Sequence, residues 1–257
     1  MMALIDAHCH LTANELHDTL DYAITTARAA GIVAMVTNAT SPEDWQAQTS
    51  VAARFPEVRF AWGIHPWWVN EDSRDAMARL RGAREAGAVA IGEIGLDGKI
   101  ATPMELQEAV FAAQLDVAQE LGLPVVIHAR GAYDRIQRML HERGPLEHGG
   151  IVHAFSASAQ IAEDLMAHGL HVSMGAALAY KPSKKRRAVL DTVWPEYLLL
   201  ETDSPDMAPP QARNVPNTPA NLLYVLRGLL NYVDATPEEA AAVTTRNAAR
   251  IFNMELP

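Results

Sequence analysis

Polar residues that can bind metal ions recur at the ends of short apolar runs in this sequence. The run LIDAHCHL, residues 4–11, carries Asp6, His8 and His10 at alternate positions. Five further runs end in residues of the same kind, namely His65, Glu93, Asp97, His128, His153 and Asp203, and one of these runs also carries Arg130. Imidazole and carboxylate groups together suit zinc, and carboxylate-rich sets also suit manganese or magnesium. The pattern therefore predicts a metal centre that activates water or polarises a substrate.

Eight apolar, often β-branched runs contain these residues and are predicted to be strands. They span residues 4–11, 32–40, 58–66, 88–97, 124–131, 150–156, 171–178 and 197–205. Longer segments with helical periodicity lie between them, such as residues 103–123, which begin with a proline and end near Gly122. Strands alternating with helices predict an α/β fold, a TIM-type (β/α)8 barrel formed as a single domain over residues 1–257.

The main alternative is an open, doubly wound parallel sheet. That fold would normally show a glycine-rich phosphate-binding loop after the first strand. Here the first strand ends in HCHLTANE instead, so we favour the closed barrel.

A closed barrel would gather the polar strand ends, because they converge on one cavity where active sites of this fold lie. Residues two apart on a strand point to the same side, so Asp6, His8 and His10 are expected to share a face. Burying so many polar groups is costly unless they are paired or bind metal. The other histidines are expected on the surface, away from this cavity; they are His17, His141, His148, His168 and His171.

The composition limits the classes of protein that fit. The chain has 257 residues, one cysteine and a formal net charge of −10. The charge argues against broad coating of nucleic acid, although a local cleft can still bind it. No apolar run reaches the roughly 18 residues of a membrane span, and the N-terminus lacks the features of a secretory signal. We therefore expect a cytoplasmic protein with no membrane segment and no obligate protein partner.

Six motifs at predicted strand ends resemble those of the TatD family of metal-dependent hydrolases. They are DAHCH (6–10), GIHP (63–66), IGEIGLD (91–97), PVVIHAR (124–130), IVHAFS (151–156) and LETDSP (200–205), in the family's order. The resemblance continues through NTPANL (217–222) and TTRNAARIFN (244–253). It implies an amidohydrolase-like barrel that hydrolyses phosphodiesters with divalent metal ions, as a deoxyribonuclease or phosphodiesterase does.

The resemblance also implies roles for individual residues. His8, His10, Glu93 and Asp203 would hold one metal ion, and Glu93, His128 and His153 would hold a second, with Glu93 bridging the two. The two divalent ions could be zinc, magnesium or manganese. His65 would contact the substrate.

The chemistry of the side chains suggests additional roles for three residues. Asp203 could also accept a proton from the attacking water. Arg130 has the geometry to bind phosphate oxygens, and a structural salt bridge to Asp97 is an equal alternative. Asp6 is expected to orient a ligand histidine from behind.

The substrate remains open at this point. Trp67 and Trp68 could stack on bases or only cap the barrel mouth, and the basic run YKPSKKRR (180–187) could face phosphates or be a solvated loop. The chain departs from the family pattern at residues 98–102 and 213–216, where Arg213 remains but Asn214 and Val215 replace glycine and lysine. DNA or a small phosphodiester is therefore one candidate substrate, and a small ester, lactone or amide is the other. A non-catalytic metal-bound scaffold is a weaker third interpretation.

Overall fold

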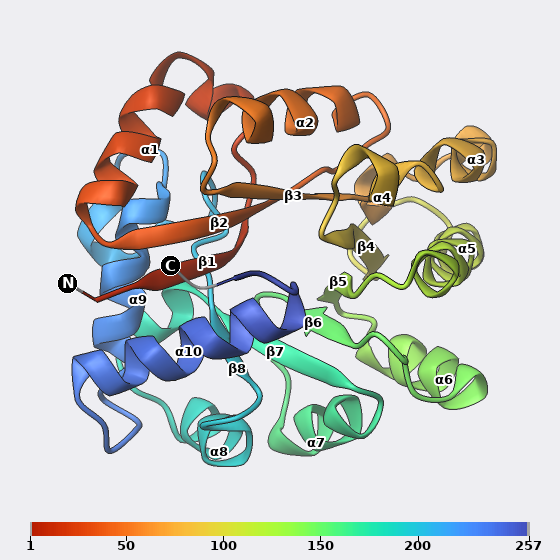
Figure 1. The fold of residues 1–257 in the computed structure, drawn as a ribbon. Helices are drawn as coiled ribbons and strands as arrows, with labels where there is room; N and C mark the ends of the chain where they lie inside the picture. Colours follow the sequence, from red (N-terminus) through yellow and green to blue (C-terminus); the bar gives the residue numbers. More distant parts are fainter. Residues whose placement is uncertain (1, 256–257) are drawn as a thin grey trace.

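The structure, a computed structural model, describes residues 2–255 and contains one sheet of eight parallel strands in consecutive order, β1 to β8 (Figure 1). The strands are β1 Leu4–Cys9, β2 Ile32–Asn38, β3 Val58–Trp62, β4 Ala90–Asp97, β5 Val125–Arg130, β6 Gly150–Val152, β7 Leu170–Met174 and β8 Leu198–Leu200. Because each strand pairs in parallel with the next along the chain, every connection must cross back to the same end of the sheet.

Residues just beyond β8 close the sheet against β1. The amide of Asp203 donates to the carbonyl oxygen of His8 over 3.0 Å, and the amide of His10 donates to Ser204 over 2.6 Å. The buried carboxylate of Asp6 accepts two further bonds, from the amide (2.9 Å) and the hydroxyl (2.5 Å) of Thr202. The predicted (β/α)8 barrel is thus confirmed, and the open-sheet alternative is wrong.

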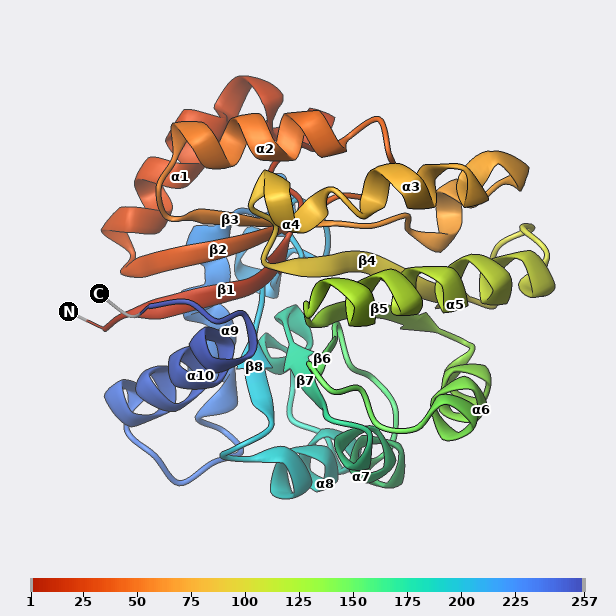
Figure 2. The ribbon, with the colours of Figure 1, turned by 45° about the vertical axis from the view of Figure 1, so that its right-hand side comes forward.

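Helices surround the strands on the outside of the barrel (Figures 1 and 2). They are α1 Leu20–Ala29, α2 Trp45–Arg54, α3 Ala76–Leu80, α4 Ala83–Ala86, α5 Met104–Leu121, α6 Tyr133–Arg143, α7 Ala159–Ala167, α8 Lys184–Val193, α9 Leu222–Leu229 and α10 Pro237–Ile251. Helix α5 agrees with its sequence pattern, because it starts directly after Pro103 and ends at Gly122, whose φ of 64° suits glycine.

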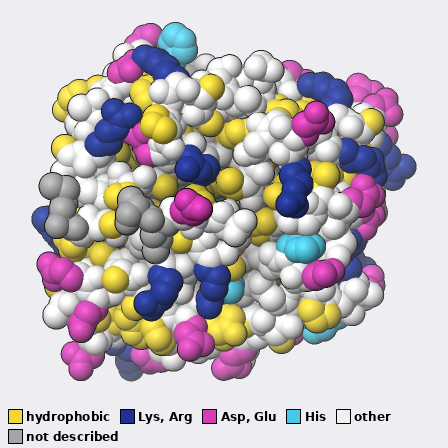
Figure 3. Space-filling view, viewed as in Figure 1, with side chains coloured by type: hydrophobic (Ala, Val, Ile, Leu, Met, Phe, Trp, Pro, Cys, Tyr) yellow, Lys and Arg dark blue, Asp and Glu magenta, His cyan; other side chains and the backbone are white. Residues whose placement is uncertain are grey.

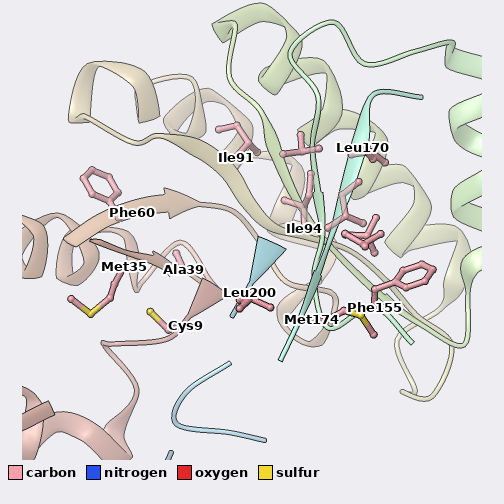
Figure 4. Packing of buried hydrophobic residues seen from close by; sticks show 14 of the residues in the cluster. Cys9, Met35, Ala39, Phe60, Ile91, Ile94, Phe155, Leu170, Met174 and Leu200 are labelled. Atoms are coloured by element: carbon pink, nitrogen blue, oxygen red, sulfur yellow. The ribbon is translucent and has the colours of Figure 1, made fainter. Parts of the chain in front are cut away.

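Two buried clusters fix this arrangement. The larger one lies between strands and helices, and Figure 4 shows part of it, including Cys9, Met35 and Phe60. The smaller one draws residues from seven strands, as the barrel interior must, and adds Ala248, Ala249 and Phe252 from the α10 region. Asn247 of α10 also donates to the carbonyl of Leu198, the first residue of β8, so α10 closes the N-terminal end of the barrel.

The strand ends differ from the sequence prediction. Most strands stop earlier than predicted, and β6 and β8 are only three residues long. Ala154 and Asp203, which follow them, have φ angles of 45° and 56° that no strand contains. The β1–β2 pairing also shifts register between Asp6 and Cys9. The predicted shared face of Asp6 with His8 and His10 is therefore wrong, because alternation breaks within β1.

The side of the molecule drawn in Figure 3 has no large patch of one charge, because basic and acidic side chains are interspersed there. Over residues 2–255, none of the helices combines the length and apolar character that crossing a membrane requires.

Candidate active site

A cleft of about 670 Å³ opens at the C-terminal ends of the strands, opposite the end closed by α10. Its lining includes the predicted residues His10, His65, Glu93, His128, Arg130, His153 and Asp203. His8 is fully buried directly beneath them. The structure therefore brings together the predicted metal ligands with His65 and Arg130, as expected for strand ends of a barrel, while Asp6 and Asp97 lie outside the lining.

Glu93 lies at the centre of this cluster, with an exposed fraction of only 2%. Its Oε1 atom is 2.9 Å from Nδ1 of His128 and 2.8 Å from Nε2 of His153. Its Oε2 atom is 3.4 Å from Nε2 of both His8 and His10. The two carboxylate oxygens thus face two different pairs of histidines.

Asp203 completes the group around His8 and His10. Its Oδ1 atom is 3.3 Å from Nε2 of His8 and 3.5 Å from Nε2 of His10. Its left-handed backbone, with φ of 56°, is one that aspartate adopts more readily than most residues. This conformation follows directly after β8 and presents the carboxylate to the cleft.

Charged neighbours shift the pKa values of the side chains in this cluster. Burial alone would raise the pKa of Glu93, but the surrounding histidines, His153 first, hold it well below its usual value. Burial likewise opposes the charge of His10, yet the hydrogen bond to Asp203 and the charge of Glu93 raise the pKa of His10 to about 9. The carboxylates are therefore ionised, and they attract protons or metal cations into the space between the rings.

His65 differs from the other histidines in its hydrogen bonding. Its Nδ1 atom accepts a bond from the amide of Trp67 over 3.1 Å, and burial lowers the pKa of the ring. The neutral ring must then carry its proton on Nε2, which lies 3.4 Å from Oε1 of Glu93. His65 therefore presents a hydrogen-bond donor to the site.

Oxygen atoms lie behind three of the rings, and the one behind His10 is at hydrogen-bond distance. Nδ1 of His10 lies 3.0 Å from the carbonyl oxygen of Asn38, and Nε2 of His128 lies 3.5 Å from Oδ2 of Asp97. Nδ1 of His153 lies 3.8 Å from Oε1 of Glu201. Asn38 and Glu201 were not singled out in the sequence, although Glu201 stands two residues before Asp203 in LETDSP, the spacing that places strand residues on one side.

Asp6 has a different place from the one predicted. Over the described residues 2–255, its carboxylate accepts from the amides of His8 and Thr202 and from the Thr202 hydroxyl, and from no histidine ring. The prediction that it orients a ligand ring is therefore wrong. Asp6 instead joins β1 to the segment after β8.

Arg130 and the two tryptophans lie at the rim of the cleft. The Arg130 side chain is 58% exposed, and its Nη1 atom is 3.7 Å from Oδ2 of Asp97. Trp67 and Trp68 are 58% and 56% exposed, so neither buries itself as an apolar cap. All three side chains are accessible to a ligand in the cleft.

The sequence profile of the family described as TatD related DNase matches residues 5–253. The chain belongs to the TatD family. This membership confirms the resemblance seen in the motifs, and with it the predicted enzyme class of metal-dependent hydrolase.

Similar proteins agree with the TatD assignment over their full lengths. The chain is 31% identical to the uncharacterized metal-dependent hydrolase YabD of Bacillus subtilis, over 98% of this chain and 99% of that protein. It is 34% identical to the 3'-5' ssDNA/RNA exonuclease TatD of Cronobacter sakazakii, with 97% of each chain covered. The crystal structure of the TatD homolog YjjV from Escherichia coli superposes with a TM-score of 0.91 at 30% identity, over 98% of both chains.

The regions where this TatD chain departs from the family pattern lie outside the cleft. None of the residues 98–102 or 213–216 is among the described residues that line it. The second half of the basic run is helical, because Lys184 begins α8 and Ser183 caps it by accepting from the amide of Arg186. Arg187 donates to the carbonyls of Asn231 and Tyr232, so part of this run packs α8 against the loop after α9.

Proposed function

We propose that this cleft hydrolyses phosphodiester bonds with two divalent metal ions, within one domain spanning residues 1–257. His8, His10, Glu93 and Asp203 would hold one ion, and Glu93, His128 and His153 the second, with Glu93 shared. The single cysteine, which is buried, fits a reducing cytoplasm.

The spacing of the donor atoms around His8 and His10 is the observation that carries the first ion of the proposal. Nε2 of His8 and Nε2 of His10 are 3.1 Å apart, and each lies 3.3–3.5 Å from Glu93 and Asp203 oxygens. Most of these separations are too long for good hydrogen bonds. They match the roughly 3.4 Å between ligand atoms that each stand about 2.1 Å from one tetrahedral ion.

The tautomers of the rings support the division between ligands and substrate contacts. Nδ1 of His10 faces the carbonyl of Asn38 and donates its proton there, so Nε2 is the nitrogen that would bind a metal once its own proton is displaced. His65 has the opposite arrangement, with its proton on Nε2. His65 is therefore proposed as a donor to a substrate oxygen rather than as a ligand.

The other residues of the cleft have separate roles in catalysis and substrate binding. Divalent ions supply Lewis acidity there, which makes water a better nucleophile and offsets phosphate charge. Asp203 accepts the proton that the attacking water loses, and it is ionised because its pKa is held far below the usual range by His10 and His8 despite burial. Arg130 offers two parallel N–H donors to the phosphate oxygens, and Trp67 and Trp68 offer faces on which a base can stack.

Single-stranded nucleic acid is the proposed substrate, on the strength of the exonuclease-named relative. The rim of the cleft favours a second candidate, a small ester, lactone or amide. Outside the proposed ligands, the lining carries Glu15, Asp44 and Asp206, and among the described residues Arg130 is its only lysine or arginine. An acidic rim repels a polyanion more than it repels a small neutral molecule.

The test is a comparison of the parent with Glu93→Gln, after metal removal and reloading with Mn²⁺. The parent should bind two ions. A nuclease should hydrolyse a chromogenic phosphodiester and single-stranded DNA, whereas the second candidate should hydrolyse a carboxylic ester. Glu93→Gln should lose the ligand that the two ions share. Its activity should fall by more than the roughly 10–100-fold that is typical when a residue behind a metal ligand is replaced.

Glu15→Gln serves as the matched control, because it changes an exposed carboxylate at the rim of the same cleft. It should keep both ions. Two ions bound and full activity in Glu93→Gln would refute the bridging role, and activity on the ester alone would decide for the second candidate.

A further inference from the structure

A second cluster of possible metal ligands lies on the outside of the barrel, between α6 and α7, which stand side by side in Figures 1 and 2. It consists of His141 on α6, Asp164 on α7 and His168 at the end of α7, each offering one donor atom within 4.8 Å of the others. None of the three lines the cleft described above. The cluster is therefore independent of the proposed catalytic centre.

The contacts within this outer cluster are directional. Nε2 of His141 lies 3.0 Å from Oδ1 of Asp164, and the rings of His141 and His168 meet edge to face with centroids 4.8 Å apart. The other oxygen of Asp164, Oδ2, accepts from the side-chain amide of Gln137 over 2.8 Å. Gln137 thus fixes the carboxylate so that its free oxygen points to the histidines.

His168 supplies an observation that a simple ion pair does not explain. Its exposed fraction is 7%, and its Nδ1 atom is buried without a hydrogen-bond partner among residues 2–255. A salt bridge between His141 and Asp164 would leave this buried nitrogen unpaired, which is unfavourable. A cation bound through this nitrogen, together with His141 and Asp164, would give it a partner.

Helical spacing brings the donors onto facing surfaces. Asp164 and His168 are four residues apart at the end of α7, and Gln137 and His141 are four residues apart on α6. Residues at this spacing lie on the same face of a helix. The ligand face of α7 therefore meets the ligand face of α6 across one interhelical groove.

We propose that His141, Asp164 and His168 bind a zinc-class transition-metal ion that clamps α6 to α7. Two imidazoles and one carboxylate suit zinc better than calcium or magnesium, which prefer oxygen ligands. Tetrahedral ligands stand about 3.4 Å apart, and the His141 side chain, 57% exposed, is free to move by the small distance needed. The clamped helices follow β5 and β6, the strands that lead to His128 and His153.

The experiment compares the parent with His141→Ala and with His148→Ala, an exposed histidine in the segment after α6 that lies outside the cluster. Each protein is stripped of metal, dialysed against Zn²⁺ and analysed for zinc bound per chain, and its melting temperature is recorded with and without Zn²⁺. The parent and His148→Ala should bind one more zinc ion per chain than His141→Ala. Their zinc-induced rise in melting temperature should also exceed that of His141→Ala, while hydrolysis in the cleft stays the same in all three proteins.

Asp164→Asn provides a second variant, because it keeps the shape of the side chain while removing the charge. It should lose the same single ion. Equal zinc stoichiometry in the parent, His141→Ala and Asp164→Asn would overturn the proposal, and so would equal thermal shifts.

Discussion

The indole nitrogen of Trp67 donates a hydrogen bond to Oδ2 of Asp97 over 2.8 Å. The same oxygen lies 3.5 Å from Nε2 of His128 and 3.7 Å from Nη1 of Arg130. Burial raises the pKa of Asp97, but the Trp67 bond and its other partners lower it overall, so the carboxylate is ionised. One buried carboxylate therefore links the exposed rim of the cleft to a proposed metal ligand.

Asp97→Asn should weaken metal binding without unfolding the barrel. The amide keeps the size of the side chain but loses the charge that faces Nε2 of His128, which would favour a proton on Nε2 when a metal binds Nδ1. The expected loss of Mn²⁺ affinity is about 10–100-fold, measured by calorimetric titration of the metal-free protein. Trp67→Phe removes only the indole N–H and should keep the parent's affinity. Unchanged affinity in Asp97→Asn would show that His128 does not depend on this carboxylate.

His171 makes the stability of the protein depend on pH far from the cleft. Burial and the charge of Arg250 lower the pKa of this ring from 6.5 to about 4. Between these values the unfolded chain binds a proton that the folded chain does not, so the free energy of unfolding falls as pH falls. The free energy of unfolding is unaffected above about pH 6.5 and is reduced by at most about 3 kcal/mol when the pH falls to 4.

His171→Gln should flatten this dependence, because glutamine does not titrate and its carbonyl can still accept from Arg250. Urea unfolding at pH 7 and at pH 5 measures the difference in each protein. His148→Gln, at an exposed site, should follow the parent. Parallel stability curves for the parent and His171→Gln would contradict the assignment.

Arg187 is expected to support the fold rather than the binding of nucleic acid. It donates to the carbonyls of Asn231 and Tyr232, the former over 2.7 Å, and its guanidinium lies 5.1 Å from the Tyr232 ring centroid. Arg187→Gln should lower the free energy of unfolding by about 1–2 kcal/mol. Lys184→Gln, at the exposed start of α8, should leave it unchanged or slightly raised, because a cation opposes the helix dipole there. Equal urea midpoints for both variants would contradict this role.

The sequence predicted the architecture and the contents of the site for a physical reason. Eight strands alternating with helices, without a glycine-rich loop after the first strand, favoured a closed barrel, in which polar residues at the strand ends meet at one mouth. His8, Glu93 and His128 met there even though they come from β1, β4 and β5. Residue type and position were sufficient for this conclusion, without any knowledge of side-chain geometry.

Details that depend on tertiary contacts could not be read from the sequence. The register shift in β1 redirects Asp6 to Thr202, and periodicity gives no sign of it. His168 and His171 were expected on the surface and are both only 7% exposed, because neighbouring elements cover them. His17, His141 and His148 are exposed as predicted. The basic run was ambiguous because the partners of Arg187, Asn231 and Tyr232, lie 44 and 45 residues away in the chain.

Arg130 and Asp206 carry opposite charges on the cleft lining, so replacing each one tests whether the substrate is a polyanion. Arg130 is the cation of the cleft lining among the described residues, whereas Asp206 is an exposed acid on the same lining. Burial and the nearby Asp203 raise the pKa of Asp206, so its carboxylate already lies in a negative environment. A polyanion that enters the cleft should therefore be attracted by one residue and repelled by the other.

If single-stranded DNA is the substrate, Arg130→Ala should raise its Michaelis constant, and Asp206→Asn should lower it. A charge a few ångströms from a phosphate changes the binding free energy by about 1 kcal/mol in water, or about fivefold in affinity. Loss of one phosphate contact should also reduce the slope of log affinity against log salt by about 0.7 in Arg130→Ala. Kinetics on DNA across a salt series measure both effects, and turnover of a neutral carboxylic ester serves as the control.

Metal content should stay at the parent's level in both variants, since loss of metal in Arg130→Ala would mean that this residue acts through Asp97. Identical DNA kinetics in the parent and both variants at every salt concentration would place the small-ester candidate ahead of the nuclease.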